Sequence, residues 1–333
     1  MRWFAEKYPK RLPGFVILTV AALAAASLVG CGEEPGVTGS FDRSFTVNGP
    51  VHLEISSGSG DVHISATPGN EVRIHGEVHA HAWGSTSKER LLEELKSNPP
   101  VSQEGNLIKV GQSSQAMRRT SIDYTIEAPA ETEISCVASS GDVEVEGVQG
   151  PAMFVSGSGD VTARSIAKDV QIKTASGDLK LEEISGQIQI TTGSGDVEIH
   201  TVKGAVRLGT GSGDVEITHP GDNVEASTGS GDVEVSDAVA DLRLHTGSGE
   251  IKVDGNPGAS NYWDLHASSG SVTVDVPQSA SFRLYAHTNS GDIDPKIPVA
   301  MEGTVGKHEL RARIGDGKAR VEIETSSGDI ELD

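Results

Sequence analysis

Short runs of alternating apolar and polar residues recur along most of the chain, and many end in Ser-Gly-Asp. From Asp142 to Glu250 this turn returns every 18 residues, six times in succession. When each unit is numbered from its Asp, slots two and four and slots eleven and thirteen are mostly Val, Ile or Leu. A period of two with many β-branched residues is typical of β-strands. Each unit therefore predicts two short strands with one apolar face.

The two strands of a unit need a tight corner at each end. Slot seven supplies an apolar residue to one corner (Val148, Ile166, Ile184 and Val202). Ser-Gly-Asp forms the other, because glycine adopts the positive φ angles that tight turns require. One unit is thus one coil of a β-solenoid, whose equivalent residues stack about 4.8 Å apart. A single coil would not fold alone, because its apolar residues are covered only by neighbouring coils.

The regions beside the regular array divide the chain. Residues 44–136 form an irregular N-terminal β region, in which Thr86-Ser87-Lys88-Glu89 is a capping box that predicts a helix over 86–97. This region is expected to cap the open edge of the solenoid. The regular repeats occupy 137–333, with a Gly-rich excursion at 303–317 before a last rung from Val321 to Leu332.

The first residues predict export rather than a folded element. Residues 1–30 have a basic start and an uncharged apolar run of 16 residues, which is shorter than the ~20 that a spanning helix needs. Leu28-Val29-Gly30-Cys31 resembles the lipobox of bacterial lipoproteins. The resemblance implies cleavage before Cys31 and its lipidation, with residues 31–43 as a tether. Several acyl chains would anchor the protein stably to a membrane.

Composition narrows the function classes. With 48 acidic and 27 basic residues, the formal net charge is −21. Nucleic acid is therefore excluded as a partner, because Lys and Arg supply most of the affinity for phosphates. Cys136 has no intramolecular partner once Cys31 is lipidated, so disulfides do not hold this fold together.

The lipobox, Ile126-Glu127-Ala128-Pro129 and the TGSGDVEI and SSGDIEL units together resemble the bacterial "putative adhesin" family of β-solenoid domains of unknown function. The match extends from about Phe41 to Asp333. The resemblance implies an all-β, single-stranded, right-handed β-helix in the cell envelope, with no catalytic residue and no cofactor. An outer-membrane address follows from Gly32, which is not an aspartate. The expected function is a non-enzymatic, adhesin-like interaction or structural surface, whose partner is an envelope glycan or protein.

A column of aspartates is the main candidate site. Clustered carboxylates can bind Ca²⁺, but the nine-residue calcium repeat has one residue between its Gly and its Asp, and here they are adjacent. The simpler interpretation is that each Asp caps its own turn by accepting backbone N–H bonds. Both interpretations concern the same six residues, which are Asp142, Asp160, Asp178, Asp196, Asp214 and Asp232.

Two further interpretations involve other residues. Stacked acids imitate the carboxyl pair of a glycosidase, and a β-helical lyase or hydrolase would need an irregular cleft, expected around Trp263, Tyr262 and Tyr285. His79 and His81 share one strand face and could bind zinc with a third ligand. The alternative is that these histidines are simply solvated.

Overall fold

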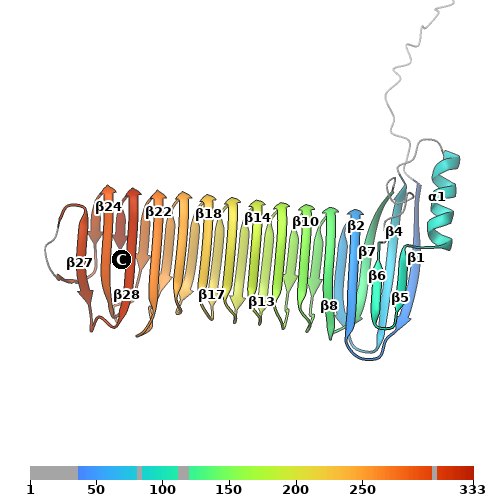
Figure 1. Ribbon diagram of the computed structural model, residues 1–333, viewed down its shortest axis with the longest axis horizontal. Helices are drawn as coiled ribbons and strands as arrows, with labels where there is room; N and C mark the ends of the chain where they lie inside the picture. Colours follow the sequence, from blue (N-terminus) through green and yellow to red (C-terminus); the bar gives the residue numbers. More distant parts are fainter. Residues whose placement is uncertain (1–36, 81–84, 112–119, 302–305) are drawn as a thin grey trace, which may run out of the picture. The chain divides into compact units, whose positions relative to one another are not determined.

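The computed structural model describes residues 37–80, 85–111, 120–301 and 306–333 (Figure 1). Of the two compact units of the chain, Met1–Pro35 and Gly36–Asp333, only the second contains described residues. The signal segment, Cys31, His81 and the side chain of Thr86 therefore lie outside the description. Within the described residues, no helix is long and apolar enough to cross a membrane.

The described residues of the second unit are all-β apart from one helix, and their strands form two sheets of 14 and 15 strands, here called sheet A and sheet B. Sheet A runs, in spatial order, through β1 (Val37–Thr46), β4 (Glu71–Ala80), β7 (Thr120–Pro129), β3 (Val62–Thr67), β9 (Val143–Glu146), β11 (Val161–Arg164), β13 (Leu179–Ile184), β15 (Val197–Val202), β17 (Val215–Pro220), β19 (Val233–Ala238), β21 (Ile251–Gly255), β23 (Val272–Asp275), β29 (Ile330–Leu332) and β25 (Ile293–Pro295). Sheet B runs through β26 (Ala300–Met301), β27 (Glu309–Ile314), β24 (Phe282–Ser290), β28 (Ala319–Ser327), β22 (Tyr262–Ser269), β20 (Leu242–Ser248), β18 (Val224–Ser230), β16 (Val206–Ser212), β14 (Ile188–Ser194), β12 (Val170–Ser176), β10 (Ala152–Ser158), β8 (Thr132–Ser140), β2 (Val51–Ser59), β6 (Leu107–Val110) and β5 (Val101–Glu104).

Successive coils pair in parallel through the regular part of the chain. Leu179 is the partner of Val197 in sheet A, and Ile188 is the partner of Val206 in sheet B, both 18 residues apart. The aliphatic residues of the predicted inward slots are buried in every regular coil, and the corner aliphatics Val148, Ile166, Ile184 and Val202 are each 1 % exposed. The predicted apolar face is therefore confirmed.

One residue at the slot-seven corner has a left-handed backbone. Residue six of five successive coils has φ between 54° and 59°, although none of the five is glycine (Ser165, Glu183, Thr201, His219 and Asp237). This turn interrupts the two-residue alternation, so that the next residue points inward instead of outward. The corner aliphatic is buried for that reason.

A column of hydroxyl side chains lies inside the solenoid, beside the Ser-Gly-Asp turns. Thr174, Thr192 and Thr210 are at most 8 % exposed. Thr192 donates its hydroxyl to the carbonyl of Ser194 at 3.0 Å, and Thr246 donates to the carbonyl of Gly231 at 2.9 Å. The sequence analysis did not identify these threonines as inward, although they continue the alternation by one further position.

The N-terminal part ends sheet A with strands out of sequence order and a helix. Helix α1 (Ser85–Ser97) begins one residue before the predicted helix and packs beside β1, the edge strand (Figure 1). Leu92 and Leu95 are buried, and a Cβ on Gly39 of β1 would lie 2.6 Å from Leu92 Cδ1. The close approach of this helix therefore needs glycine at position 39.

The order of the coils departs from the sequence near the other end. Strands β28 and β29, expected as the last rung, lie between the coil of β22 and β23 and the coil of β24 and β25. The physical reason is that the Ser-Gly turns of the coils are interchangeable, so Ser327 is in register with both Ser269 and Ser290. The periodicity sets a residue's place within a coil, and it does not set the order of the coils.

Candidate binding surfaces

Hydrogen bonds accepted by the Asp column link each coil to the next. Each of the six predicted aspartates accepts, through Oδ1, the backbone N–H of the acidic residue one coil further on, at 2.7–2.9 Å. The expected bond lay within the turn of the same aspartate, whereas the observed bond joins neighbouring turns. Asp61 and Asp329 extend this arrangement at both ends. Among the described residues, no group of three or more His, Cys, Asp or Glu is placed to hold a metal ion.

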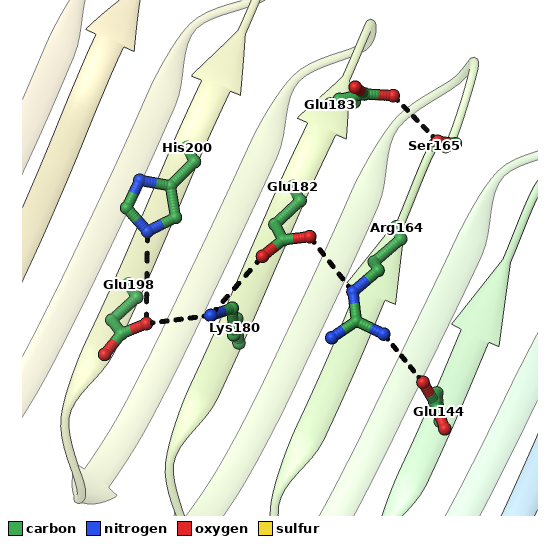
Figure 2. Close-up of polar contacts among 8 residues, drawn as sticks. All are labelled: Glu144, Arg164, Ser165, Lys180, Glu182, Glu183, Glu198 and His200. Atoms are coloured by element: carbon green, nitrogen blue, oxygen red, sulfur yellow. Dashed lines mark hydrogen bonds and ion pairs between the residues drawn. The ribbon is translucent and has the colours of Figure 1, made fainter.

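Charged side chains also link coils on the outer face of sheet A (Figure 2). Arg164 contacts Glu144 at 2.8 Å and Glu182 at 3.0 Å, and Lys180 lies 3.4 Å from Glu182 and 3.5 Å from Glu198. Desolvation raises the pKa of Glu182, but hydrogen bonds and charge from Lys180 and Arg164 outweigh it, so the net pKa lies below its ordinary value. Half-exposed ion pairs of this kind contribute little stability, about 0–1 kcal/mol each. This face is a solvated surface.

The early histidines contact acids from other strands. His79 Nε2 lies 3.0 Å from Asp123 Oδ2, and His75 Nδ1 lies 2.8 Å from Asp42 Oδ1. Sequence spacing did not show these partners, because they are 44 and 33 residues away. In each of these two pairs, one histidine contacts one carboxylate.

Three adjoining hollows follow sheet B along the ends where its parallel strands begin. The first has a volume of about 290 Å³ and extends from Glu133 to Arg207. The second, of about 250 Å³, shares Ala205 and Arg207 with the first and reaches Tyr262. The third, of about 540 Å³, is lined by Glu322, which accepts a hydrogen bond from the hydroxyl of Tyr262. We call these three hollows the sheet B groove.

The lining of the sheet B groove combines polar and apolar residues. Gln171, Gln187 and Gln189 line the first hollow, and Arg207 pairs with Glu225 at 3.4 Å beside the second. Exposed apolar side chains occur at the β8 and β10 end, where Met153 is 39 % exposed. The arrangement offers donors and acceptors in a row rather than one deep cavity.

The third hollow includes part of the predicted irregular cleft. Tyr285 lines it, and the guanidinium of Arg311 lies 5.2 Å from the centre of the Tyr285 ring. Burial and the bond to Glu322 raise the pKa of Tyr262 to about 12. Trp263 is not part of the cleft, because it is fully buried and donates its Nε1–H to the carbonyl of Ala240 at 2.8 Å. Its inward position follows from the strand alternation that buries Leu265 and Ala267.

Stacked parallel coils with this internal column of aliphatic residues define the class of the protein as a β-solenoid repeat protein. The chain belongs to the family described as Toastrack DUF4097, whose model matches residues 52–238 and 222–333. No curated protein matches the chain.

Solved bacterial structures resemble the chain weakly. A "putative adhesin" from Bacteroides fragilis is 15% identical, with a TM-score of 0.36, and 89% of this chain and 97% of that chain are covered. A "putative cell adhesion protein" from Clostridium sporogenes is 12% identical, with a TM-score of 0.21 and coverage of 88% and 99%. A "putative lipid binding protein" from Parabacteroides distasonis is 11% identical, with a TM-score of 0.27 and coverage of 88% and 97%. Likeness at these TM-scores carries no argument about function.

Proposed function

We propose that this protein is a non-enzymatic, lipid-anchored protein of the bacterial cell envelope, which binds an extended envelope glycan along the sheet B groove. The observation that carries the proposal is the succession of three hollows across neighbouring strands, each lined in part by polar side chains. Parallel strands lie about 4.8 Å apart, so the ten strands from β8 to β24 extend over about 40 Å. A linear polymer would use that length, whereas a small metabolite would need only one hollow.

The chemistry of the lining supports a glycan. Amide, carboxylate and guanidinium groups, such as those of Gln189, Glu225 and Arg207, exchange hydrogen bonds with sugar hydroxyls. A carboxyl pair that hydrolyses glycosidic bonds needs two acids in different environments. The six stacked aspartates instead make the same bond in the same geometry, which favours a binding role over a catalytic one.

The anchor and the finer architecture belong to the same proposal. Lipidation of Cys31, placement at the outer membrane facing the periplasm or the surface, and the domain boundaries at 31, 44 and 137 rest on the sequence. Coils of 18 residues are supported by the register of the paired strands, and the right hand of the β-helix rests on the family resemblance alone.

The anchor is tested by changing Cys31→Ala. The variant should remain at precursor size and should not incorporate labelled palmitate, because the acylated sulfur is missing. Incorporation at the level of the unchanged protein would show that Cys31 is not the lipidated residue.

Glycan binding is tested with the full-length protein in detergent micelles and purified cell-wall glycan. Gln189→Ala combined with Arg207→Ala should weaken binding at least fivefold, because both side chains line the first hollow. Thr191→Ala is the matched control, since Thr191 is exposed on the same strand but does not line the hollow. Equal binding by all variants would contradict the proposal. Capture of an envelope protein instead would favour a protein partner, and release of shortened glycan would favour an enzyme.

A further inference from the structure

Three arginines lie side by side across three adjacent strands at the far end of the sheet B groove. Arg283 of β24 is the direct partner of Arg313 in the antiparallel strand β27 and of Arg320 in the parallel strand β28. All three side chains are exposed. Like charges at directly opposed positions destabilise a sheet. An arrangement that costs stability in the free protein suggests a ligand that offsets the repulsion.

Further cations surround this row, which we call the arginine row. Arg311 and Lys318 occupy diagonal positions beside Arg283 and line the same hollow. Five of the chain's 27 Lys and Arg residues therefore lie at one place in a protein with a net charge of −21. Random placement on an acidic surface would scatter these charges rather than gather them.

Nearby acidic side chains neutralise only part of this positive charge. Arg320 pairs with Glu322, Arg311 pairs with Glu309 at 2.8 Å, and Lys318 lies 3.7 Å from Asp316. For Arg283, no ion pair occurs within the described part of the chain. The arginine at the centre of the row is therefore available to an external anion.

The shape of the third hollow keeps the row accessible. Its volume of about 540 Å³ is roughly twice that of either neighbour. Gly317, which lines the hollow, has φ of 68°, and a Cβ there would lie 2.9 Å from Arg313 Cγ and 3.2 Å from Arg283 Cγ. A side chain at this position would push both arginine stems aside, so glycine keeps the stems together over the hollow.

We propose that the arginine row binds successive carboxylates of an acidic oligosaccharide, a glycan with one uronic acid on each sugar unit. This inference rests on the proposed glycan-binding function and names its ligand class. Guanidinium groups bind carboxylates in a planar, bidentate manner. The ~4.8 Å separation of neighbouring strands is close to the length of one sugar unit, so consecutive units would meet Arg320, Arg283 and Arg313 in turn.

The net negative charge is compatible with this ligand. Exposed charges more than about 8 Å apart are largely screened at physiological salt. A short oligouronate at the arginine row therefore experiences mainly the local cations. A long nucleic acid would also meet the acidic turn column, and the net charge of −21 predicts that it does not bind.

The test is calorimetric titration of the full-length protein in micelles with trigalacturonate at 50 mM and 300 mM NaCl. We expect trigalacturonate to bind at least tenfold more tightly than neutral maltotriose, and the affinity to fall several-fold at the higher salt. Arg283→Gln should weaken trigalacturonate binding at least tenfold. Arg43→Gln, which removes a half-buried strand arginine from β1, should change it less than twofold.

A second measurement separates binding from folding. Arg283→Gln should raise the melting temperature of the ligand-free protein at low salt, because it removes like-charge repulsion from both neighbours. Trigalacturonate should raise the melting temperature of the unchanged protein and not that of the variant. If Arg283→Gln unfolds the protein, the affinity of Arg313→Gln for trigalacturonate is measured instead.

Several outcomes would overturn the inference. These are equal affinity for maltotriose, equal loss of affinity in Arg43→Gln, and binding of phosphatidylglycerol vesicles without binding of trigalacturonate. If wall glycan still binds through Gln189 but trigalacturonate does not bind at the arginine row, this inference fails and the proposed function stands. If wall glycan binding also fails, both are wrong.

Discussion

The Asp column allows its hydrogen bond and its charge to be tested separately at one residue. Asp196 accepts the backbone N–H of Asp214 at 2.8 Å, and its own N–H is bonded to Asp178 Oδ1 at 2.9 Å. Asp196→Asn keeps an oxygen that can accept the bond but removes the charge. Asp196→Ala removes both. The two variants therefore differ mainly by one neutral hydrogen bond, worth about 0.5–1.5 kcal/mol.

The magnitude of the charge effect follows from the coil spacing. Unit charges about 4.8 Å apart repel by about 0.9 kcal/mol in water, so the two neighbours of Asp196 repel it by about 1.7 kcal/mol before screening by salt. Loss of the charge also weakens the hydrogen bond by about 1 kcal/mol. We therefore expect Asp196→Asn to raise the free energy of unfolding by about 0.5–1 kcal/mol at 20 mM NaCl. At 0.5 M NaCl the gain should turn into a loss of up to about 1 kcal/mol, because the repulsion is screened while the hydrogen bond stays weaker.

The assay is urea unfolding followed by circular dichroism at both salt concentrations. Asp196→Ala should be less stable than Asp196→Asn by about 1 kcal/mol at either salt concentration. Equal destabilisation by both variants would show that the charge itself is needed. A rise in stability with millimolar Ca²⁺ would show a cation site if chelation reverses it and Asp196→Asn combined with Asp214→Asn abolishes it.

Two other perturbations test the core and the groove. Leu208 is 5 % exposed and is the partner of Ile190 in the neighbouring coil, so Leu208→Asp should lower the free energy of unfolding by at least about 3 kcal/mol, measured by urea unfolding. Glu198→Ala on the outer face should change it by less than about 0.5 kcal/mol. Equal effects of the two variants would contradict the assigned faces. Burial and the bond to Glu322 raise the folded pKa of Tyr262 to about 12, above its ordinary value of 10, so this contribution to stability is complete below pH 10 and is lost as the pH rises towards 12. Between pH 9 and 11.5, the melting temperature of Tyr262→Phe should fall less than that of the unchanged protein. Parallel curves of melting temperature against pH for the two proteins would refute this expectation.

The coil could be predicted from the sequence because its signals are local. Alternation showed that residues such as Ile172 and Val197 face inward, and the structure buries both. The Ser-Gly-Asp turns marked where each coil closes. The inward threonines were missed because polar residues usually mark the outer face, whereas Thr192 satisfies its hydroxyl with a backbone carbonyl.

The site was less predictable because its parts are distant in the sequence. Arg283 and Arg320 are 37 residues apart, and they meet only because β28 lies between β22 and β24. That order depends on competition between equivalent coils, which no local pattern describes. The partner of each turn aspartate was missed for a related reason, since its acceptor role joins residues of two coils.

The position of β28 and β29 also affects the order in which the fold is completed. A chain that emerges from its N-terminus, whether from the ribosome or after export, lets regular coils add to the stack as they appear. The coil of β24 and β25 cannot follow this rule, because the strands that separate it from β22 and β23 are made afterwards. The coil of β24 and β25 must either stay undocked until β28 and β29 are available, or dock on β22 first and then be displaced by β28. Release of the residues from 319 onward therefore acts as a checkpoint, and a chain interrupted before them would have neither this end of the stack nor the arginine row.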